Sequence, residues 1–133
     1  MVDDFEAFLD DISQCFINRD FQTWRRRLVL PFSFITRDGP EVLKSEEAVM
    51  RNFDQYLFAC QVMRLDLVDR RVIALEDCND GTWLGTFETR LLSDGMLATD
   101  PYTSTALLIH DDGRFQMTSM LNARGHNEWT RAR

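Results

Sequence analysis

The feature that most constrains this fold is a run of strand-forming residues at positions 82–122, interrupted by two Asp-Gly turns. Threonine, aromatic and branched side chains dominate the run, as they do in pleated strands. The turns at residues 93–95 and 111–113 each end in glycine, which adopts the left-handed conformation of a short hairpin loop without a Cβ clash. A similar glycine turn at residues 77–81 joins the run to a strand at residues 68–75. The pattern predicts an antiparallel meander.

The second Asp-Gly turn sets the expected register of the last two strands. If His110 pairs with Arg114 across a three-residue loop, side-chain alternation defines two faces. We take as inward the face that is apolar near the turn and bears hydroxyls farther away. Its residues are Thr103, Thr105, Leu107, Ile109, Phe115, Met117, Ser119 and Leu121. Such graded polarity is typical of a pocket floor, but hydroxyls that bond to one another or to the backbone give the same pattern.

Length and composition predict one domain over residues 1–133 with enough apolar side chains for a core. The net charge of -7 argues against binding to nucleic acid or to anionic membranes. No apolar run has membrane-spanning length, and the acidic start is unlike a signal peptide. Cys15, Cys60 and Cys78 are too few and too widely spaced for a disulfide framework or a zinc site. We therefore expect a cytoplasmic protein.

Three helices are expected before the meander. Apolar residues recur at helical spacing over residues 5–16 and predict the first helix, with Asp3 as its N-cap. Asp20 is the expected cap of a short second helix that ends before Pro31, because the residue before proline avoids helical angles. Ser45 is the expected cap of the third. These helices would cover one face of the sheet.

Two further segments carry charge or aromatic character. Arg25, Arg26 and Arg27 form either an anion site or a set of cations favoured by the end of the second helix. The tail at residues 126–133 is polar apart from Trp129, and we expect it to fray or to pack on a neighbouring molecule.

The order of elements resembles the nuclear transport factor 2-like superfamily. Residues 18–24 resemble its helix-turn-helix junction, residues 30–34 and Gly39 its first strand and exit turn, and residues 111–115 its final hairpin. The resemblance implies an α+β fold in which three helices from the N-terminal half pack on a strongly curved, mostly antiparallel sheet. This would form a cone-shaped barrel with an internal pocket, and homodimers are frequent in the family.

The superfamily includes ketosteroid isomerases, scytalone dehydratase, SnoaL-like polyketide cyclases and non-catalytic binding domains, so the fold leaves the function open. The isomerases use a tyrosine on the first helix, an aspartate base at the end of the first strand and a protonated acid in the sheet. Ile12, Thr36 and Thr105 stand at or near those positions, and none of them is a base near neutral pH. The sequence therefore does not support that proton shuttle, unless Asp38 reaches the pocket.

The remaining catalytic candidates are Asp100 and Tyr102. Pro101 interrupts the strand and predicts a bend that turns one of these side chains toward the cavity. A kinked strand with Tyr102 as a packing residue would give the same sequence. His110 lies beside a turn on the expected outer face, where a solvated histidine is the simpler interpretation. No motif indicates a metal or a cofactor, and we expect none.

The expected pocket combines aromatic side chains from the helical side with hydroxyls from the strands. Its predicted lining is Trp24, Phe32, Phe34, Phe53, Tyr56, Phe87, Thr89, Thr105, Met117 and Ser119. Such a lining suits a flat apolar molecule, although aromatic residues at these spacings also fill ordinary cores.

The function that fits these residues best is a homodimeric domain that binds a small hydrophobic or aromatic ligand, without the ketosteroid isomerase catalytic set. One alternative is a SnoaL-like isomerase, cyclase or dehydratase that uses Asp100 or Tyr102. Another is a protein-interaction subunit, like the small subunits of hydroxylases. The sequence leaves open whether the domain is an enzyme.

Overall fold

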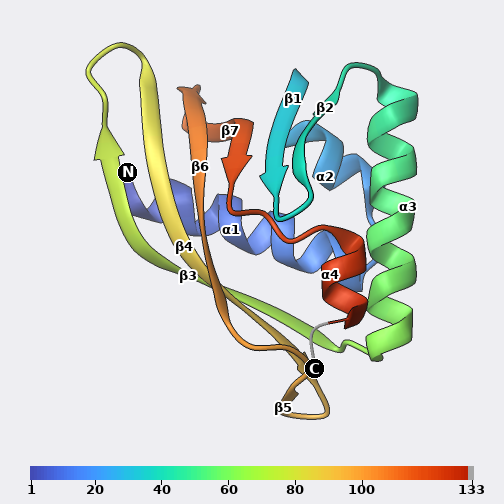
Figure 1. The fold of residues 1–133 in the computed structure, drawn as a ribbon. Coiled ribbons are helices and arrows are strands. Elements are labelled where there is room, and N and C mark those ends of the chain that lie inside the picture. The colour runs from blue at the N-terminus through green and yellow to red at the C-terminus, as the bar shows by residue number, and fades with distance from the viewer. Residues whose placement is uncertain (132–133) are drawn as a thin grey trace.

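A computed structural model describes residues 1–131 of the chain. The helices are α1 (Val2–Ile17), α2 (Phe21–Arg26), α3 (Glu46–Met63) and α4 (His126–Arg131), and the strands are β1 (Leu28–Thr36), β2 (Gly39–Leu43), β3 (Leu67–Asp77), β4 (Thr82–Ser93), β5 (Met96–Leu97), β6 (Tyr102–Asp111) and β7 (Arg114–Leu121). Figure 1 shows the long strands β3 and β4 bending along their length, with α1 across the sheet and α3 beside α4. Within the described part of the chain, no helix is long and apolar enough to cross a bilayer.

The strands form one sheet in the order β2-β1-β7-β6-β4-β3, with β5 paired to β4. All neighbouring strands are antiparallel except β1 and β7, which are parallel. The sheet is open, with β2 and β3 at its edges. The prediction of an α+β fold, with three N-terminal-half helices on a curved and mostly antiparallel sheet, is confirmed.

The helices form largely as expected. The apolar stripe of α1 is buried from Phe5 to Phe16. Asp20 caps α2 and Ser45 caps α3, each by accepting a hydrogen bond from a backbone N–H in the first turn. Asp3 as a cap was wrong, because α1 begins at Val2 without a side-chain cap.

The second helix is shorter than predicted. It ends at Arg26, and Leu28 already pairs with β7 in the sheet. The sheet pairing therefore ends α2 before Pro31 is reached.

The register predicted for the last hairpin was wrong by one residue. Asp111 pairs with Arg114, and His110 pairs with Phe115. Asp112 and Gly113 have φ of 52° and 75°, so the loop has two residues, both in the left-handed region, as type I′ hairpin turns require. A one-residue change of pairing reverses the face of every side chain on one strand.

The consequence is that the inward face of β6 is opposite to the predicted one. Ser104, Ala106 and Leu108 are buried on the core side. Thr105 lies on the other face, where its hydroxyl is 3.2 Å from that of Thr86. Phe115 on β7 is buried, as predicted.

A β-bulge divides β7 into two halves. Leu108 pairs with Met117, but the next residue of β6, Leu107, pairs with Ser119, so Thr118 is an extra residue. Such a bulge exchanges the two faces of a strand. Met117 is therefore in the core, Ser119 turns away from it, and Met120 packs against it.

The tail forms a helix and neither frays nor exposes its tryptophan within the described residues. Glu128 accepts hydrogen bonds from the backbone N–H groups of Arg37 and Gly125. The second contact is the reciprocal half of a capping box, in which the third residue of a helix bonds back to its cap. Trp129 is thereby buried in its own chain. The predicted tail also included residues 132 and 133, which lie outside the described residues.

Gly85 on β4 lies in close contact with Phe5 of α1. A Cβ atom at this position would overlap the ring of Phe5 and lie 3.0 Å from Leu108. Phe5 and Leu108 are both fully buried, so neither side chain can move into solvent to make room for a Cβ atom. The glycine is therefore required by packing between the helix and the sheet.

We predict that Gly85→Ala lowers the free energy of unfolding by about 1–3 kcal/mol, the usual cost of overpacking a core. Thr86→Ala, the next residue on the outer face, is the matched control and should cost less. Urea unfolding followed by circular dichroism measures both. Equal stability of Gly85→Ala and the unsubstituted protein would contradict the packing described here.

Candidate functional site

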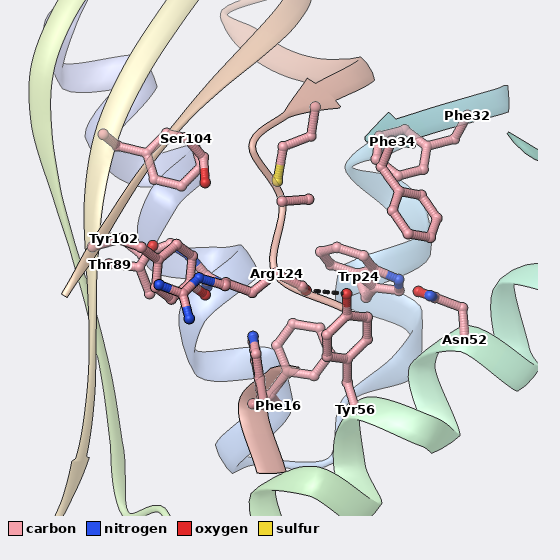
Figure 2. Close-up of a pocket in the computed structure, with 15 residues that line it drawn as sticks. Phe16, Trp24, Phe32, Phe34, Asn52, Tyr56, Thr89, Tyr102, Ser104 and Arg124 are labelled. Atoms are coloured by element: carbon pink, nitrogen blue, oxygen red, sulfur yellow. Dashed lines mark hydrogen bonds between the residues drawn. The ribbon is translucent and has the colours of Figure 1, made fainter. Parts of the chain in front are cut away.

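A cavity of about 40 Å³ lies between the inner face of the sheet and the helices. By volume it holds about three water molecules. Figure 2 shows its walls, which come from all four helices and most of the strands. The lining residues are Phe16, Trp24, Phe32, Phe34, Asn52, Tyr56, Arg70, Phe87, Thr89, Tyr102, Ser104, Met120, Ala123, Arg124 and Trp129.

The helical side of the cavity is a cluster of aromatic rings around Phe16. The centroid of its ring lies 5.0 Å from that of Trp24, 5.7 Å from Tyr56 and 5.9 Å from Trp129. The Tyr56 and Trp129 rings meet edge to face at 4.7 Å. Because these four residues come from four different helices, the cluster holds all four helices around one wall.

The sheet side carries a row of polar residues. Arg70 on β3 pairs across the strands with Thr89 on β4, and Thr89 pairs with Tyr102 on β6. Directly paired residues lie on the same face with their Cβ atoms about 5 Å apart. The three side chains therefore form one continuous polar row, and Figure 2 shows Thr89 and Tyr102 on the same side of the cavity.

Four buried polar atoms have no hydrogen-bond partner among the described residues: Trp24 Nε1, Arg70 Nε, Thr89 Oγ1 and Trp129 Nε1. All four belong to the 15 residues that line this cavity. Buried polar groups in folded proteins are nearly always paired, and an unpaired one costs about 1–3 kcal/mol. The unpaired polar atoms of the described residues are therefore concentrated around this one cavity.

The cavity is positively charged although the chain is acidic. Of 22 aspartate and glutamate residues in the chain, none in the described part lines it, whereas Arg70 and Arg124 both do. Arg124 lies 4.8 Å from the centre of the Tyr102 ring and 4.0 Å from the carboxylate of buried Glu128. Within residues 1–131, Arg70 has no such carboxylate within ion-pair distance.

The tyrosines of the cavity are held in their neutral form. Burial raises the pKa of Tyr56, whose hydroxyl donates a hydrogen bond to the carbonyl oxygen of Arg124. Burial also raises the pKa of Tyr102, while the nearby charge of Arg70 and contacts with Trp129 and Thr89 lower it. Neither of those two contacts has the geometry of a full hydrogen bond.

Residues 5–121 match the family described as the SnoaL-like domain. The chain belongs to this family, a member of the nuclear transport factor 2-like superfamily. No curated protein matches its sequence.

Several solved structures share the fold of this SnoaL-like domain. A domain of unknown function with a cystatin-like fold from Nostoc punctiforme superposes with a TM-score of 0.67 at 17% identity, covering 93% of this chain and 78% of the other. Aln2 from Streptomyces gives 0.64 at 15% identity, covering 91% and 88%. LinA gives 0.63 at 12% identity, covering 89% and 81%. Identities this low establish the fold alone.

The SnoaL-like domain places six of the predicted pocket residues at its cavity: Trp24, Phe32, Phe34, Tyr56, Phe87 and Thr89. Phe53 and Met117 are buried in the core but do not line the cavity. Thr105 and Ser119 lie on the opposite face of the sheet, because of the two-residue turn and the bulge. Their assignment to the pocket was wrong.

The two catalytic candidates, Asp100 and Tyr102, lie in different environments. Asp100 is exposed, and Tyr102 lines the cavity. At the positions compared with ketosteroid isomerases, Ile12 is buried in the core and Thr36 accepts a hydrogen bond from the backbone N–H of Asp38. The Asp38 side chain is exposed, so no carboxylate reaches the cavity from this turn.

The arginine triplet and His110 have structural partners. Arg25 bonds Glu46, Arg26 bonds Thr23, and Arg27 bonds Asp11 and the carbonyl of Phe115. The structural interpretation of the triplet is the one that these contacts support. His110 is on the core side, 2.9 Å from Asp4 of α1, and not on the outer face as expected.

Several lining residues were not predicted from the sequence, among them Arg70, Arg124 and Trp129. Arg70 lies two residues from Val68 and two from Val72, both of which point inward. Since every second residue of a strand shares a face, its inward position could be predicted once that strand was assigned. Trp129 and Arg124 were missed because the tail was expected to fray. Gly125 followed three residues later by Glu128 is a helix-start signal that identifies α4.

The tyrosine pKa shifts give a test of this wall. Unfolded tyrosines ionise near pH 10, and the folded state keeps both tyrosines neutral beyond that. Folded stability should therefore fall as pH rises above about 10, because only the unfolded state releases these protons. We predict that absorbance near 295 nm rises together with unfolding and not before it. Ionisation of either tyrosine near pH 10 in the folded protein would contradict this arrangement.

Proposed function

We propose that this SnoaL-like domain binds a small hydrophobic or aromatic molecule in the cavity. The observation that carries the proposal is that every unpaired buried polar side-chain atom of the described chain lies in the wall of this one aromatic cavity. Ligand pockets are mostly apolar with a few polar groups that orient the ligand, and this wall has that composition.

Binding requires part of the wall to move, because about 40 Å³ is far below the several hundred Å³ of most ligand pockets. The part suited to move is α4. It has six residues, packs on α3, and follows the irregular segment 122–125. A hydrogen bond from the backbone N–H of Arg37 to Glu128 joins it to the turn between β1 and β2. Outward displacement of Trp129 would enlarge the cavity between the sheet and α3.

Binding without proton-shuttle chemistry fits the lining best. No carboxylate or histidine among the described residues lines the cavity, so a general base near neutral pH is missing from its wall. The alternative of an isomerase, cyclase or dehydratase has one supporting observation, the Tyr102 hydroxyl in the cavity, where it could donate a proton or a hydrogen bond to a carbonyl group.

We also propose that the domain forms a homodimer through the outer face of the sheet. Leu84, Leu107 and Ile109 lie on this face, next to the hydrogen-bonded pair Thr86 and Thr105. A cytoplasmic location remains part of the proposal, since the three cysteines are free thiols. The same outer face would serve the alternative of an assembly subunit, which differs in having another protein as its partner.

The binding proposal is tested with indole, a neutral aromatic probe. We predict a dissociation constant below about 1 mM by isothermal titration calorimetry, within the range for a ligand of this size. Ala123→Leu fills the cavity and should weaken binding at least about tenfold. Ala74→Leu, on an exposed part of β3, is the matched control and should bind indole as the unsubstituted protein does. No binding of indole, or equal loss in both variants, would refute the proposal.

A further inference from the structure

We infer that the ligand of this cavity is a small aromatic carboxylate, with its anionic group held by Arg70, Thr89 and Trp129. The inference rests on the proposed binding function and specifies the chemistry of the bound molecule. It follows from three observations: the position of Arg70 in the sheet, its lack of an acidic partner, and the donors that surround it.

Arg70 occupies an apolar stretch of the inner face. On one side of the Arg70–Thr89 pair the sheet pairs Val68 with Leu91. On the other side it pairs Val72 with Phe87. The arginine therefore sets a cation and a hydroxyl between two apolar rows, where packing alone would favour another apolar pair.

The charge of Arg70 has no carboxylate partner among the residues that the structure describes. One terminal nitrogen, Nη1, bonds the carbonyl oxygen of Ile12 at 2.8 Å and the hydroxyl of Ser13 at 3.2 Å. Its Nε is buried and unpaired. Glu6 and Asp10 line a surface groove that Arg70 also reaches, but neither forms an ion pair with it.

Arg27 shows how this chain treats a buried arginine that has only a structural role. It pairs with Asp11 at 2.9 Å and bonds the carbonyl oxygen of Phe115. Buried charges are generally compensated in this way. Arg70 is only half-buried, but its Nε is buried, and among the described residues it has the backbone contact without an anion. An anion would complete the environment of this buried edge.

The donors around Arg70 converge. Thr89 is its direct cross-strand partner, and Thr89 and the indole N–H of Trp129 both lie beside the hydroxyl of Tyr102. Thr89 is 0% exposed and Trp129 3% exposed, so water in bulk does not reach them. The charge of Arg70 also lowers the pKa of Tyr102 and of Tyr56, which places that charge within reach of the cavity.

A carboxylate matches this set of groups. Arg70 Nε and Trp129 Nε1 can only donate, and an ionised carboxylate only accepts, through two oxygens. A hydrocarbon would leave these donors unpaired, and a cation would be repelled. Phosphate groups carry up to two charges, and Arg124 is already beside Glu128. One uncompensated guanidinium therefore favours a single negative charge, with the aromatic part of the ligand against Phe16 and Trp24.

The test compares three probes that share one ring: indole-3-carboxylate, indole-3-carboxamide and indole. Calorimetry should show the carboxylate binding about tenfold or more tightly than the carboxamide, because hydrogen bonds to charged groups are the strong ones. Arg70→Met should remove this preference, so that the carboxylate and the carboxamide bind with affinities within about twofold of each other. Arg71→Met is the matched control, since Arg71 is the exposed neighbour that pairs with Asp69, and it should keep the preference.

Thr89→Val gives a second readout that does not depend on removing a charge. Valine has the shape of threonine without the hydroxyl, so it removes an unpaired buried group from the free protein. We expect a higher melting temperature together with several-fold weaker binding of indole-3-carboxylate. A purely structural hydroxyl would give a lower melting temperature.

Three outcomes would overturn the inference. These are equal affinity for the carboxylate and the carboxamide, retention of the preference in Arg70→Met, and a lower melting temperature in Thr89→Val. Any of them with indole still bound leaves the proposed function in place. If indole also fails to bind, the proposed function itself is refuted. Should Arg70→Met not fold, the comparison of probes and the Thr89→Val variant still decide.

Discussion

The two-residue turn at Asp112 and Gly113 is the constraint on which the interior of this domain depends. By pairing Asp111 with Arg114, it sets the alternation of β6, so that Ser104, Ala106 and Leu108 face the helices. Tyr102 shares that face at the far end of the strand and completes the polar row begun by Arg70 and Thr89. The contents of the cavity wall thus depend on backbone geometry at the opposite end of β6.

The same constraint explains what could be predicted from sequence. Helix stripes, caps and the meander follow from local signals. The stripes of α1 and α3, the caps of α2 and α3 and the long strands were predicted correctly, whereas the cap of α1 and the end of α2 were not. Trp24, Phe32, Phe34 and Tyr56 could be placed at the cavity because a bulky aromatic residue on an inward face has few other positions. Phe87 and Thr89 followed from the simple alternation of β4, which pairs with β6 without a shift.

The predictions that failed depended on backbone geometry that hydrophobic periodicity does not encode. A loop of Asp-Asp-Gly permits either two or three loop residues, and the choice between them reverses β6. The bulge at Thr118 has no signal of its own in the sequence, and it moves Ser119 out of the interior. The parallel pairing of β1 with β7 and the folding of α4 onto α3 join segments far apart in the chain, which periodicity does not reveal.

The interior of the molecule has one part that is fully packed and one part that is not. Around Phe5 the core is tight enough to require a glycine in the sheet. Around Phe16 the aromatic packing is equally close, but Arg70, Thr89 and both cavity tryptophans keep polar atoms unpaired. Unpaired groups lower the stability of the free protein, and a ligand that pairs them recovers it. The family provides the fold, and we propose that a ligand binds where these polar atoms are unpaired.

The central claim is that the unpaired donors of the cavity are the groups that a ligand contacts. The three tryptophans offer a direct test, because Trp24 and Trp129 line the cavity and Trp83 does not. In ¹H–¹⁵N spectra recorded during titration with indole-3-carboxylate, the Trp129 indole N–H proton should shift downfield and exchange more slowly with solvent, while that of Trp83 stays in place. Saturable binding that leaves the Trp129 signal unchanged, or that moves Trp83 instead, would contradict the account.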